Sequence, residues 1–567
     1  MVPQAFGNKP KGERIKRIEE IEEIEEIQKR QVMPEMKRNY YMMAIMLFAA
    51  IAVLNPGQGL ANCDHCKKEV NDKIIQSIDS YVQKVKQEWQ LPGIAASFAK
   101  GGEVFYSKAY GLKEIGQPDA IDVNTVFQIG SVSKSFTAAV MASLVDEGTV
   151  SWEDTVVNIL PDFKMYDPWV TANMQVKDVM THKSGLGGQV GTYLPNLGYD
   201  RDDIYRMMAQ IKPAYSFRND YQYNNITFII AAKIIEKVTG KTWEENVQER
   251  IFNPLGMTST SMNGEGYIAT ENKAVPHEYL YKDSIAIRPL YGDDQALWWL
   301  TVIGPAGSIN SNVGDMIKYA EFHRLNGVAQ NGKQVISEKS AKYLHKGVTI
   351  TSQDDNRTTL YGHCWFVEQN NRYRLYFHTG TTWGFSTLCF FVPELELSGI
   401  MFMNCEVGAS PRYAIMRRLI DLMMGAPVGE FTDQFKDYSK ESFESYIASE
   451  KSAAEKAAAK EAEEKASGKA VNLPAPKASA IVGRYVKDEP WGDVVVEAEK
   501  GLLYITTGKK AFKNRLNHKE GNTYTFWSDG YEFAIHFDMD EKGKKSVGFI
   551  LELGKGEEKS VGGWKRK

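Results

Sequence analysis

A serine followed three residues later by a lysine is the first pattern in this sequence that could do chemistry, and it occurs twice. The two pairs are Ser97/Lys100 and Ser131/Lys134. A serine hydroxyl is a weak nucleophile unless a neighbouring base takes its proton, and an uncharged lysine amine can be that base. Side chains three residues apart point to opposite faces of a strand, which is the pattern around Ser97. They share one face of a helix, which is the pattern after Gly130, so we predict that Ser131 and Lys134 are the reactive pair.

Two further motifs bear on this prediction, because a serine at a helix start is more often only an N-cap. Residues 223–225 (YNN) are the one Y-x-N in the chain. A Lys- or His-led triplet with Ser or Thr and then Gly occurs at 183–185 (KSG) in a loop and at 378–380 (HTG) after a strand-like stretch. Only the second offers an edge strand along which a substrate backbone could lie.

Strand-like stretches stand at both ends of the region that carries these motifs, and helical stretches lie between them. The predicted strands are 94–99, 104–109, 373–377, 386–392 and 399–404, and the predicted helices are 72–89, 133–147, 225–238 and 313–326. Helices between two groups of strands predict an antiparallel sheet closed by the two ends of the region, with helices packed on it. The expected fold class is therefore α+β.

In chain order, Ser131/Lys134, Tyr223 and His378 resemble the S-x-x-K, Y-x-N and K/H-T/S-G motifs of the serine penicillin-recognising family. Other stretches between residues 71 and 425 also look like class C β-lactamase-related serine hydrolases: NTVFQIGSVSKSFTA, VKDVMTHKSGL, IIEKVTGKTWEENV, IFNPLGMTST, GPAGSINSNVGDM and YGHCWF. That family includes β-lactamases, D-Ala-D-Ala carboxypeptidases, D-aminopeptidases and esterases. The resemblance implies a β-lactamase/transpeptidase-like fold.

The resemblance also implies roles for the motif residues. Ser131 would form an acyl-enzyme, and either Lys134 or Tyr223 would take its proton, each needing a pKa well below its reference value of about 10. The sequence does not decide between these two bases. The expected substrate-binding residues are Asn225, His378, Thr379, Gly380 and Thr381.

Two of these positions are expected to act through the backbone. The N–H groups of Ser131 and Thr381 would form an oxyanion hole, and glycine at 380 would leave room for the close approach. Asn225 would bond both Lys134 and the substrate amide. The hydroxyls of Thr379 and Thr381 could donate to a substrate carboxylate.

His378 departs from the lysine that β-lactamases of this family usually carry. A lysine is a permanent cation that helps to hold the carboxylate of a β-lactam or of a terminal D-Ala, whereas a histidine is mostly neutral near pH 7. We therefore rank D-Ala-D-Ala carboxypeptidase, D-amino-acid peptidase or esterase activity above class C-like β-lactamase activity. The alternative outside enzymes is a penicillin-binding sensor or scaffold with a ligand-binding C-terminal domain.

The overall composition excludes other classes of protein. The 567 residues contain 68 basic and 72 acidic side chains, so there is no basic excess of the kind that nucleic acid binding needs. Five cysteines are too few for a disulfide scaffold of this size, and no second Cys/His pair with zinc spacing follows Cys63 and Cys66. We expect no metal and no cofactor, and a small peptide, ester or β-lactam as substrate. The oligomeric state stays open.

The N-terminal part of the sequence predicts export. The uncharged apolar run 42–54 follows Lys37-Arg38 and precedes small residues, which is typical of a secretory signal peptide and short of the ~20 residues of a membrane-spanning helix. We assign 36–61 to the signal and 1–35 to a low-complexity extension ahead of a mis-assigned start. The expected location is periplasmic or extracellular. Membrane association would require lipidation of Cys63, although Asn62 departs from a lipoprotein signal.

The C-terminal part changes character twice. Residues 441–474 are rich in Ala, Glu and Lys, which is typical of a solvated helical linker. Residues 475–567 carry short alternating stretches separated by turns, which predict a small all-β barrel. This domain is similar to the lipocalin-like module of some family members. The hydrolase domain is expected at 71–425.

Overall fold

The computed structural model describes residues 64–281, 285–406, 410–426, 475–528, 531–552 and 560–567. The predicted extension, the signal peptide and the helical linker lie outside these residues, as does Cys63. Residues 74–567 form one compact unit. Within the described ranges, no helix combines the length and the apolar composition that a membrane span requires.

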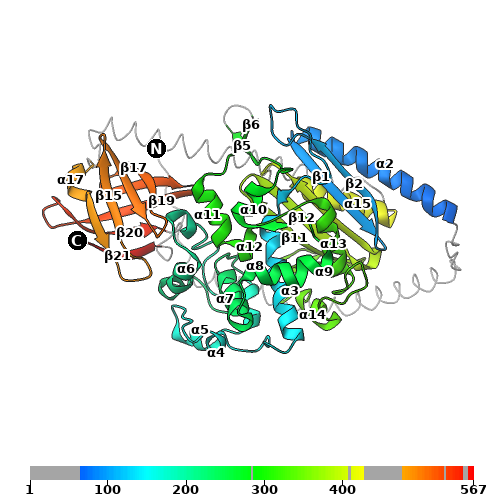
Figure 1. The fold of residues 1–567 in the computed structure, drawn as a ribbon, viewed down its shortest axis with the longest axis horizontal. Coiled ribbons are helices and arrows are strands. Elements are labelled where there is room, and N and C mark those ends of the chain that lie inside the picture. The colour runs from blue at the N-terminus through cyan, green and yellow to red at the C-terminus, as the bar shows by residue number, and fades with distance from the viewer. Residues whose placement is uncertain (1–63, 282–284, 407–409, 427–474, 529–530, 553–559) are drawn as a thin grey trace, which may run out of the picture. The chain divides into compact units, whose positions relative to one another are not determined.

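An eight-stranded antiparallel sheet is the centre of the larger domain, in the order β2-β1-β13-β12-β11-β10-β9-β8. Strands β1, β2, β11 and β12 of this sheet are labelled in Figure 1. Its strands are β1 (Gly93–Lys100), β2 (Glu103–Gly111), β8 (Thr349–Gln353), β9 (Thr358–Tyr361), β10 (Phe366–Gln369), β11 (Arg374–Thr382), β12 (Phe385–Val392) and β13 (Leu397–Met403). The first hairpin, β1–β2, pairs with the last strand, β13. The two ends of the domain therefore close the sheet, which confirms the predicted α+β fold.

Helices cover both faces of this sheet, and alternate residues of one strand show how. Ile94, Ala96 and Phe98 of β1 belong to a core shared with α2 (Asp64–Glu88) and α15 (Ser410–Met424). Their neighbours Ala95 and Ala99 belong to the second, larger core on the opposite face. A strand buried on both faces reads as a continuous apolar run, as the GIAASFA part of β1 does.

The larger core is built around α3 (Ser133–Asp146), in which every residue from Ser133 to Leu144 is buried. Small polar side chains tolerate this burial because they bond to carbonyls: Ser135 to Val132, Ser143 to Val140 and Thr137 to Pro305. Lys134 is the one charged side chain in this buried stretch, and it needs partners of its own. Helices that contribute buried side chains to this core include α6 (Arg201–Met207), α7 (Thr227–Thr239), α8 (Trp243–Val247), α11 (Asp294–Val302), α12 (Gly304–Gly307) and α13 (Val313–Arg324).

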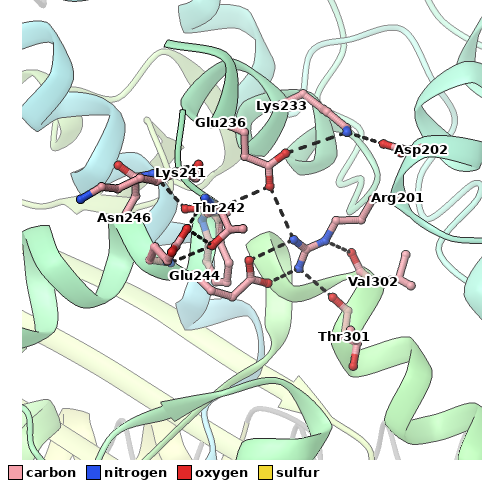
Figure 2. Close-up of polar contacts among 12 residues, drawn as sticks. Arg201, Asp202, Lys233, Glu236, Lys241, Thr242, Glu244, Asn246, Thr301 and Val302 are labelled. Carbon is pink, nitrogen blue, oxygen red and sulfur yellow. Dashed lines mark hydrogen bonds and ion pairs between the residues drawn. The ribbon is translucent and has the colours of Figure 1, made fainter. Parts of the chain in front are cut away.

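Arg201, the first residue of α6, joins four of these helices (Figure 2). Its guanidinium donates to both carboxylate oxygens of Glu244 on α8, at 2.6 and 3.3 Å, and lies 3.9 Å from Glu236 on α7. It also donates to the carbonyls of Thr301 and Val302 at 2.7 and 3.0 Å. The last carbonyls of a helix have no partner within it, so Arg201 fixes the point where α11 ends and α12 begins.

A closed eight-stranded barrel follows in the C-terminal part, which confirms the predicted all-β domain. Its strands are β14 (Gly483–Val486), β15 (Val494–Glu499), β16 (Leu502–Thr507), β17 (Phe512–Glu520), β18 (Thr523–Ser528), β19 (Tyr531–Met539), β20 (Ser546–Glu552) and β21 (Ser560–Arg566). Aromatic rings fill the interior, with Phe549 4.7 Å from Trp564 and 5.2 Å from Tyr485 between centroids. Side chains are enough to fill a barrel of eight strands.

Candidate active site

Ser131 lies in a single 3₁₀ turn (η1, Gly130–Val132) immediately before α3, and its side chain is partly exposed. The helix itself begins at Ser133, as predicted, so Ser131 lies in the turn before the helix and not within it. Two glycines let this turn touch β11 backbone to backbone. A Cβ on Gly130, where φ is +53°, would lie 2.9 Å from the nitrogen of Thr381, and a Cβ on Gly380 would lie 1.9 Å from the carbonyl oxygen of Ile129, the residue before the turn. This contact brings the N–H groups of Ser131 and Thr381 together.

The direction of the Thr381 N–H follows from a buried arginine beneath the sheet. One nitrogen of Arg412 donates to the carbonyls of Gly380 and Thr387 at 2.6 and 2.7 Å. Gly380 and Thr387 are paired across β11 and β12. Because one nitrogen reaches both carbonyl oxygens, the two carbonyls point toward each other between the strands. Backbone groups of successive residues alternate in direction, so the N–H of the next residue, Thr381, points away from β12. The β10 pairing ends at Phe377. The N–H of Thr381 is therefore directed to the side on which Ser131 lies, as an oxyanion hole requires.

Lys134 is fully buried and its ammonium nitrogen has three partners. Nζ lies 3.0 Å from Ser131 Oγ, 2.7 Å from Asn225 Oδ1 and 3.0 Å from the carbonyl oxygen of Ala306. Burial lowers the pKa of Lys134 to about 7. In the neutral amine, two hydrogens serve Asn225 and Ala306, and the lone pair is left to face the hydroxyl of Ser131. This is the geometry of a base that takes the serine proton.

Asn225 holds its amide in one orientation. Its Nδ2 donates to Gln189 Oε1 at 3.0 Å and to the hydroxyl of Thr192 at 3.3 Å. Both partners accept, so the amide oxygen must face Lys134. Asn225 stands two residues before α7, which begins at Thr227 rather than at the predicted residue 225.

The ring of Tyr223 lies beside Lys134, with Nζ 4.7 Å from the ring centroid. Burial raises the pKa of Tyr223 well above its ordinary value, and the nearby hydroxyl of Ser131 opposes this only in part. The phenol is therefore neutral near pH 7. His182 packs against its ring at 4.1 Å between centroids and accepts the N–H of Asn224 at 3.1 Å through Nδ1. His182 thus supports the Tyr223 ring and the backbone of the Y-x-N motif.

His378 lies in β11 with its imidazole buried. Nδ1 bonds the carbonyl of Thr379 at 2.7 Å, and Nε2 lies 3.2 Å from the hydroxyl of Tyr361. A carbonyl only accepts, so Nδ1 carries the hydrogen and Nε2 accepts from Tyr361. Burial, together with the charge of Lys134, lowers the pKa of His378 to about 3. The imidazole is neutral and carries no charge toward a substrate carboxylate.

The other sequence candidates are placed apart from this group. Ser97 is buried within β1, whereas Lys100 is exposed at its end and donates to the carbonyl of Leu395. Gly185 of the 183–185 triplet has φ of +86°, and its carbonyl accepts the N–H groups of Ala214 and Tyr215 in a loop. Neither pattern forms a catalytic arrangement.

Sequence reasoning missed several residues that hold the site. Gln189 and Thr192 orient Asn225, Ala306 binds Lys134 through its carbonyl, Tyr361 binds His378, and Arg412 lies beneath β11. Ala306 and Tyr361 lie in the GPAGSINSNVGDM and YGHCWF stretches that resemble the family, yet the resemblance assigned neither residue a role, and a backbone carbonyl carries no residue-type signal. The remaining residues lie outside the three motifs and have no spacing that would have identified them.

The comparison with protein-family models agrees with this geometry. The Beta-lactamase family model matches residues 78–422, a span that contains the turn of Ser131, the Y-x-N motif and β11. The chain belongs to the Beta-lactamase family. The chain is thus a member of a family of serine hydrolases, as the motifs indicated.

Individual proteins are similar to about three fifths of this chain. The unguisins hydrolase ungD' of Aspergillus campestris (strain IBT 28561) is 27% identical over 369 residues, 62% of this chain and 66% of that protein. Penicillin-binding protein 4 of Amycolatopsis lactamdurans is 24% identical over 356 residues, 61% of this chain and 89% of that protein. The match spans less than two thirds of the ungD' chain, and 42% of ungD from Aspergillus violaceofuscus (strain CBS 115571).

Solved structures share the fold over more of the chain. The octameric penicillin-binding protein homologue from Pyrococcus abyssi has a TM-score of 0.55 and 18% identity, covering 84% of this chain and 98% of its own. The crystal structure of SurE has a TM-score of 0.52 and 15% identity, covering 88% of this chain and all of its own. At these identities the likeness concerns the fold alone.

Proposed function

We propose that this protein hydrolyses amides or esters through an acyl-enzyme on Ser131, with Lys134 as the base. The observation that carries the proposal is the 3.0 Å contact of Lys134 Nζ with Ser131 Oγ in a buried environment that lowers the pKa of Lys134 to about 7. A lysine exposed to water has a reference pKa of about 10.4 and would be protonated near pH 7. Burial thus makes the base available.

The proposed reaction has two steps. Neutral Lys134 takes the hydroxyl proton while Ser131 Oγ bonds to the substrate carbonyl carbon, and the N–H groups of Ser131 and Thr381 bind the resulting oxyanion. The carbonyl re-forms as the leaving amine or alkoxide departs with a proton that comes from Lys134 directly or through Tyr223. A water molecule, deprotonated in the same way, then attacks the acyl carbon, releases the acid and returns the proton to Ser131.

The preferred substrates are D-amino-acid peptides, including D-Ala-D-Ala peptides, or small esters. A neutral His378 favours small esters and peptides without a free carboxylate at this position, because the carboxylate of a β-lactam or of a terminal D-Ala would meet no cation on β11. Binding of a carboxylate would depend on the hydroxyls of Thr379 and Thr381. The relatives named as hydrolases and as a penicillin-binding protein support acyl transfer to serine. Class C-like β-lactamase activity is the second candidate.

Labelling and turnover together test the proposal. The full chain is treated with a fluorophosphonate or a fluorescent penicillin, and the modified peptide is identified by mass spectrometry. A panel of a D-Ala-D-Ala peptide, nitrocefin and p-nitrophenyl esters then reports turnover. We expect an adduct on Ser131, its loss in Ser131→Ala, and no change in Ser97→Ala. An adduct that never turns over would favour a penicillin-binding sensor, and an unmodified Ser131 would contradict the catalytic role.

Export is a separate proposal that rests on residues 36–61 alone. Expression in a bacterium, followed by N-terminal sequencing of protein recovered from the periplasm or medium, tests it. We expect a mature chain that starts near Asn62. A chain that stays in the cytoplasm with this segment intact would contradict the assignment, and a lipid on Cys63 would indicate membrane anchoring.

A further inference from the structure

Asn225 and Ala306, the two acceptors that hold Lys134 besides Ser131, are each held by a neighbouring segment that contacts the barrel. Asn225 Oδ1 is oriented by Gln189 and Thr192, and the segment 187–199 that carries these residues continues to Tyr199. Ala306 lies in α12, directly after α11. The turn between β16 and β17, residues 507–512, packs on both the end of segment 187–199 and the start of α6.

The first contact is a backbone-to-backbone approach between two glycines. Gly198 and Gly508 both have positive φ, +83° and +66°. A Cβ on Gly508 would lie 2.2 Å from the carbonyl oxygen of Leu197, and a Cβ on Gly198 would lie 3.0 Å from the carbonyl oxygen of Thr507. The N–H of Lys510 donates to Gly198 at 3.2 Å. Such an approach is possible only with glycine on both sides. A side chain at Gly198 or Gly508 would therefore separate the β16–β17 turn from segment 187–199.

Tryptophans of α11 hold the same segment at two points. Trp299 donates its indole N–H to the carbonyl of Thr192 at 2.8 Å, and Trp298 donates to the carbonyl of Tyr199 at 3.2 Å. The ammonium of Lys510 lies 4.3 Å above the ring of Trp298. The hydroxyl of Tyr199 in turn donates to the carbonyl of Trp491 in the barrel at 2.9 Å. Thr192, which orients Asn225, and Tyr199, which contacts the barrel, are therefore both hydrogen-bonded to α11.

The second contact leads to Ala306. Lys509 of the turn pairs with Asp200 and Asp203 at 2.8 Å each, and these two carboxylates form the capping box of α6. The next residue, Arg201, holds the last carbonyls of α11 (Figure 2). A Cβ on Gly304, the first residue of α12, would lie 2.5 Å from the Arg201 guanidinium. The turn thus braces the helix end that presents the Ala306 carbonyl to Lys134.

We propose that the β16–β17 turn of the barrel is a positioning element for catalysis: by docking on Gly198 and on Asp200/Asp203 it holds the Asn225 and Ala306 acceptors in place around Lys134. The inference rests on the proposed function of Lys134 as the base. Loss of docking would let segment 187–199 move, would loosen the Asn225 amide and would admit water to Lys134. Misplacement of a catalytic group by about 1 Å costs on the order of 100-fold in rate.

Substitutions in the full chain test the inference, each with a matched control inside the barrel. Gly508→Ala places a methyl group against Leu197, whereas Gly501→Ala has the same positive-φ strain, with φ of +81°, and meets nothing within 4 Å. Tyr199→Phe removes the hydroxyl bond to Trp491, whereas Tyr485→Phe removes a comparable bond to the carbonyl of Ile481 within the barrel. Thermal melting of all four variants identifies any that fail to fold.

We expect Gly508→Ala and Tyr199→Phe to lower kcat about 10-fold or more with little change in KM. The acidic limb of the pH–rate profile should move to higher pH, since water near Lys134 relieves the burial that lowers its pKa. Hydrogen–deuterium exchange should rise in peptides covering 187–199 and 303–307. The two control variants should match the wild type in all three measurements.

The outcomes separate this inference from the proposed function. A wild-type chain that never acylates Ser131 would overturn the proposed function, and the exchange data would still show whether docking holds segment 187–199. The positioning role alone would be overturned if the wild-type chain hydrolyses its substrate and the docking variants equal the controls in kcat, pH profile and exchange. Unchanged exchange in the docking variants is by itself sufficient to overturn it.

Discussion

The hydroxyl of Tyr361, the last residue of β9, donates to Nε2 of His378 in β11 at 3.2 Å, and both side chains are buried. The imidazole is consequently a neutral acceptor at the position where many β-lactamases carry a lysine. Anion binding at this end of the site is therefore left to hydroxyl and backbone donors. The consequence for substrate choice can be measured.

Substitution of His378 should change the preference between charged and neutral substrates. His378→Lys adds a cation beside Thr379, and a hydrogen bond to a charged group contributes about 1.5–3 kcal/mol. We expect the ratio of kcat/KM for a peptide with a free C-terminal carboxylate to kcat/KM for its methyl ester to rise about 10-fold or more. The neutral control His378→Gln should leave this ratio unchanged. Equal effects of both substitutions would show that charge is not the determinant.

The pH dependence of acylation should report Lys134. Its pKa is lowered to about 7, so the neutral base predominates above pH 7 and is lost as the pH falls through that value. We expect kcat/KM to decline about 10-fold per pH unit on the acidic side, as for any single essential base. Lys134→Arg, which stays protonated, should lose activity at every pH from 5 to 9. A flat profile in the wild type would contradict Lys134 as the base.

Asn225→Asp should move the same acidic limb in a defined direction. The substitution would put a carboxylate where the amide oxygen lies 2.7 Å from Lys134 Nζ. A nearby negative charge favours the charged amine, so the pKa of Lys134 should rise. We expect strongly reduced activity at pH 7 and partial recovery near pH 9. A uniform loss without any shift of the limb would indicate that Asn225 contributes to substrate binding alone.

Burial of Lys134 should also cost stability. Its folded pKa of about 7 lies below the ordinary value of 10.5, so between these values the unfolded chain binds more protons and stability rises with pH. Lys134→Met removes this dependence. We expect the Met variant to be more stable than the wild type in urea denaturation at pH 7, with a smaller difference at pH 9. A difference that grows with pH would contradict the direction of the pKa change.

The Arg201 network should contribute more stability than an exposed ion pair nearby. Arg201→Ala would leave Glu244 and Glu236 without their shared cation and would leave two carbonyls of α11 without a donor. We expect a loss of about 2–3 kcal/mol in the free energy of unfolding. Lys241→Ala breaks the exposed pair with Glu249 and should cost less than about 1 kcal/mol. Urea denaturation of both variants measures the contrast.

Several structural features could be predicted from local sequence because they depend on neighbours in the chain. The three-residue spacing of Ser131 and Lys134 reflects the helical period of about 3.6 residues. The continuous buried runs of β12 and β13 are typical of strands that are covered on both faces. The barrel was predicted from five alternating stretches, 494–496, 502–506, 524–527, 533–537 and 547–553, which correspond to β15, β16, β18, β19 and β20. Strands β14, β17 and β21 were missed, since β17 (FKNRLNHKE) has two buried side chains among exposed polar ones and so a weak apolar pattern.

What the sequence determined by itself is thus the family, the α+β fold with its barrel, and the identity of the motif residues. The tertiary structure decided what those residues are like chemically. Lys134 has a pKa near 7 because packing buries it, and its partners Asn225 and Ala306 lie 91 and 172 residues away along the chain. His378 is neutral because Tyr361 and the core surround it. Burial and contacts between distant segments are properties of the packed chain, and residue types alone do not encode them locally.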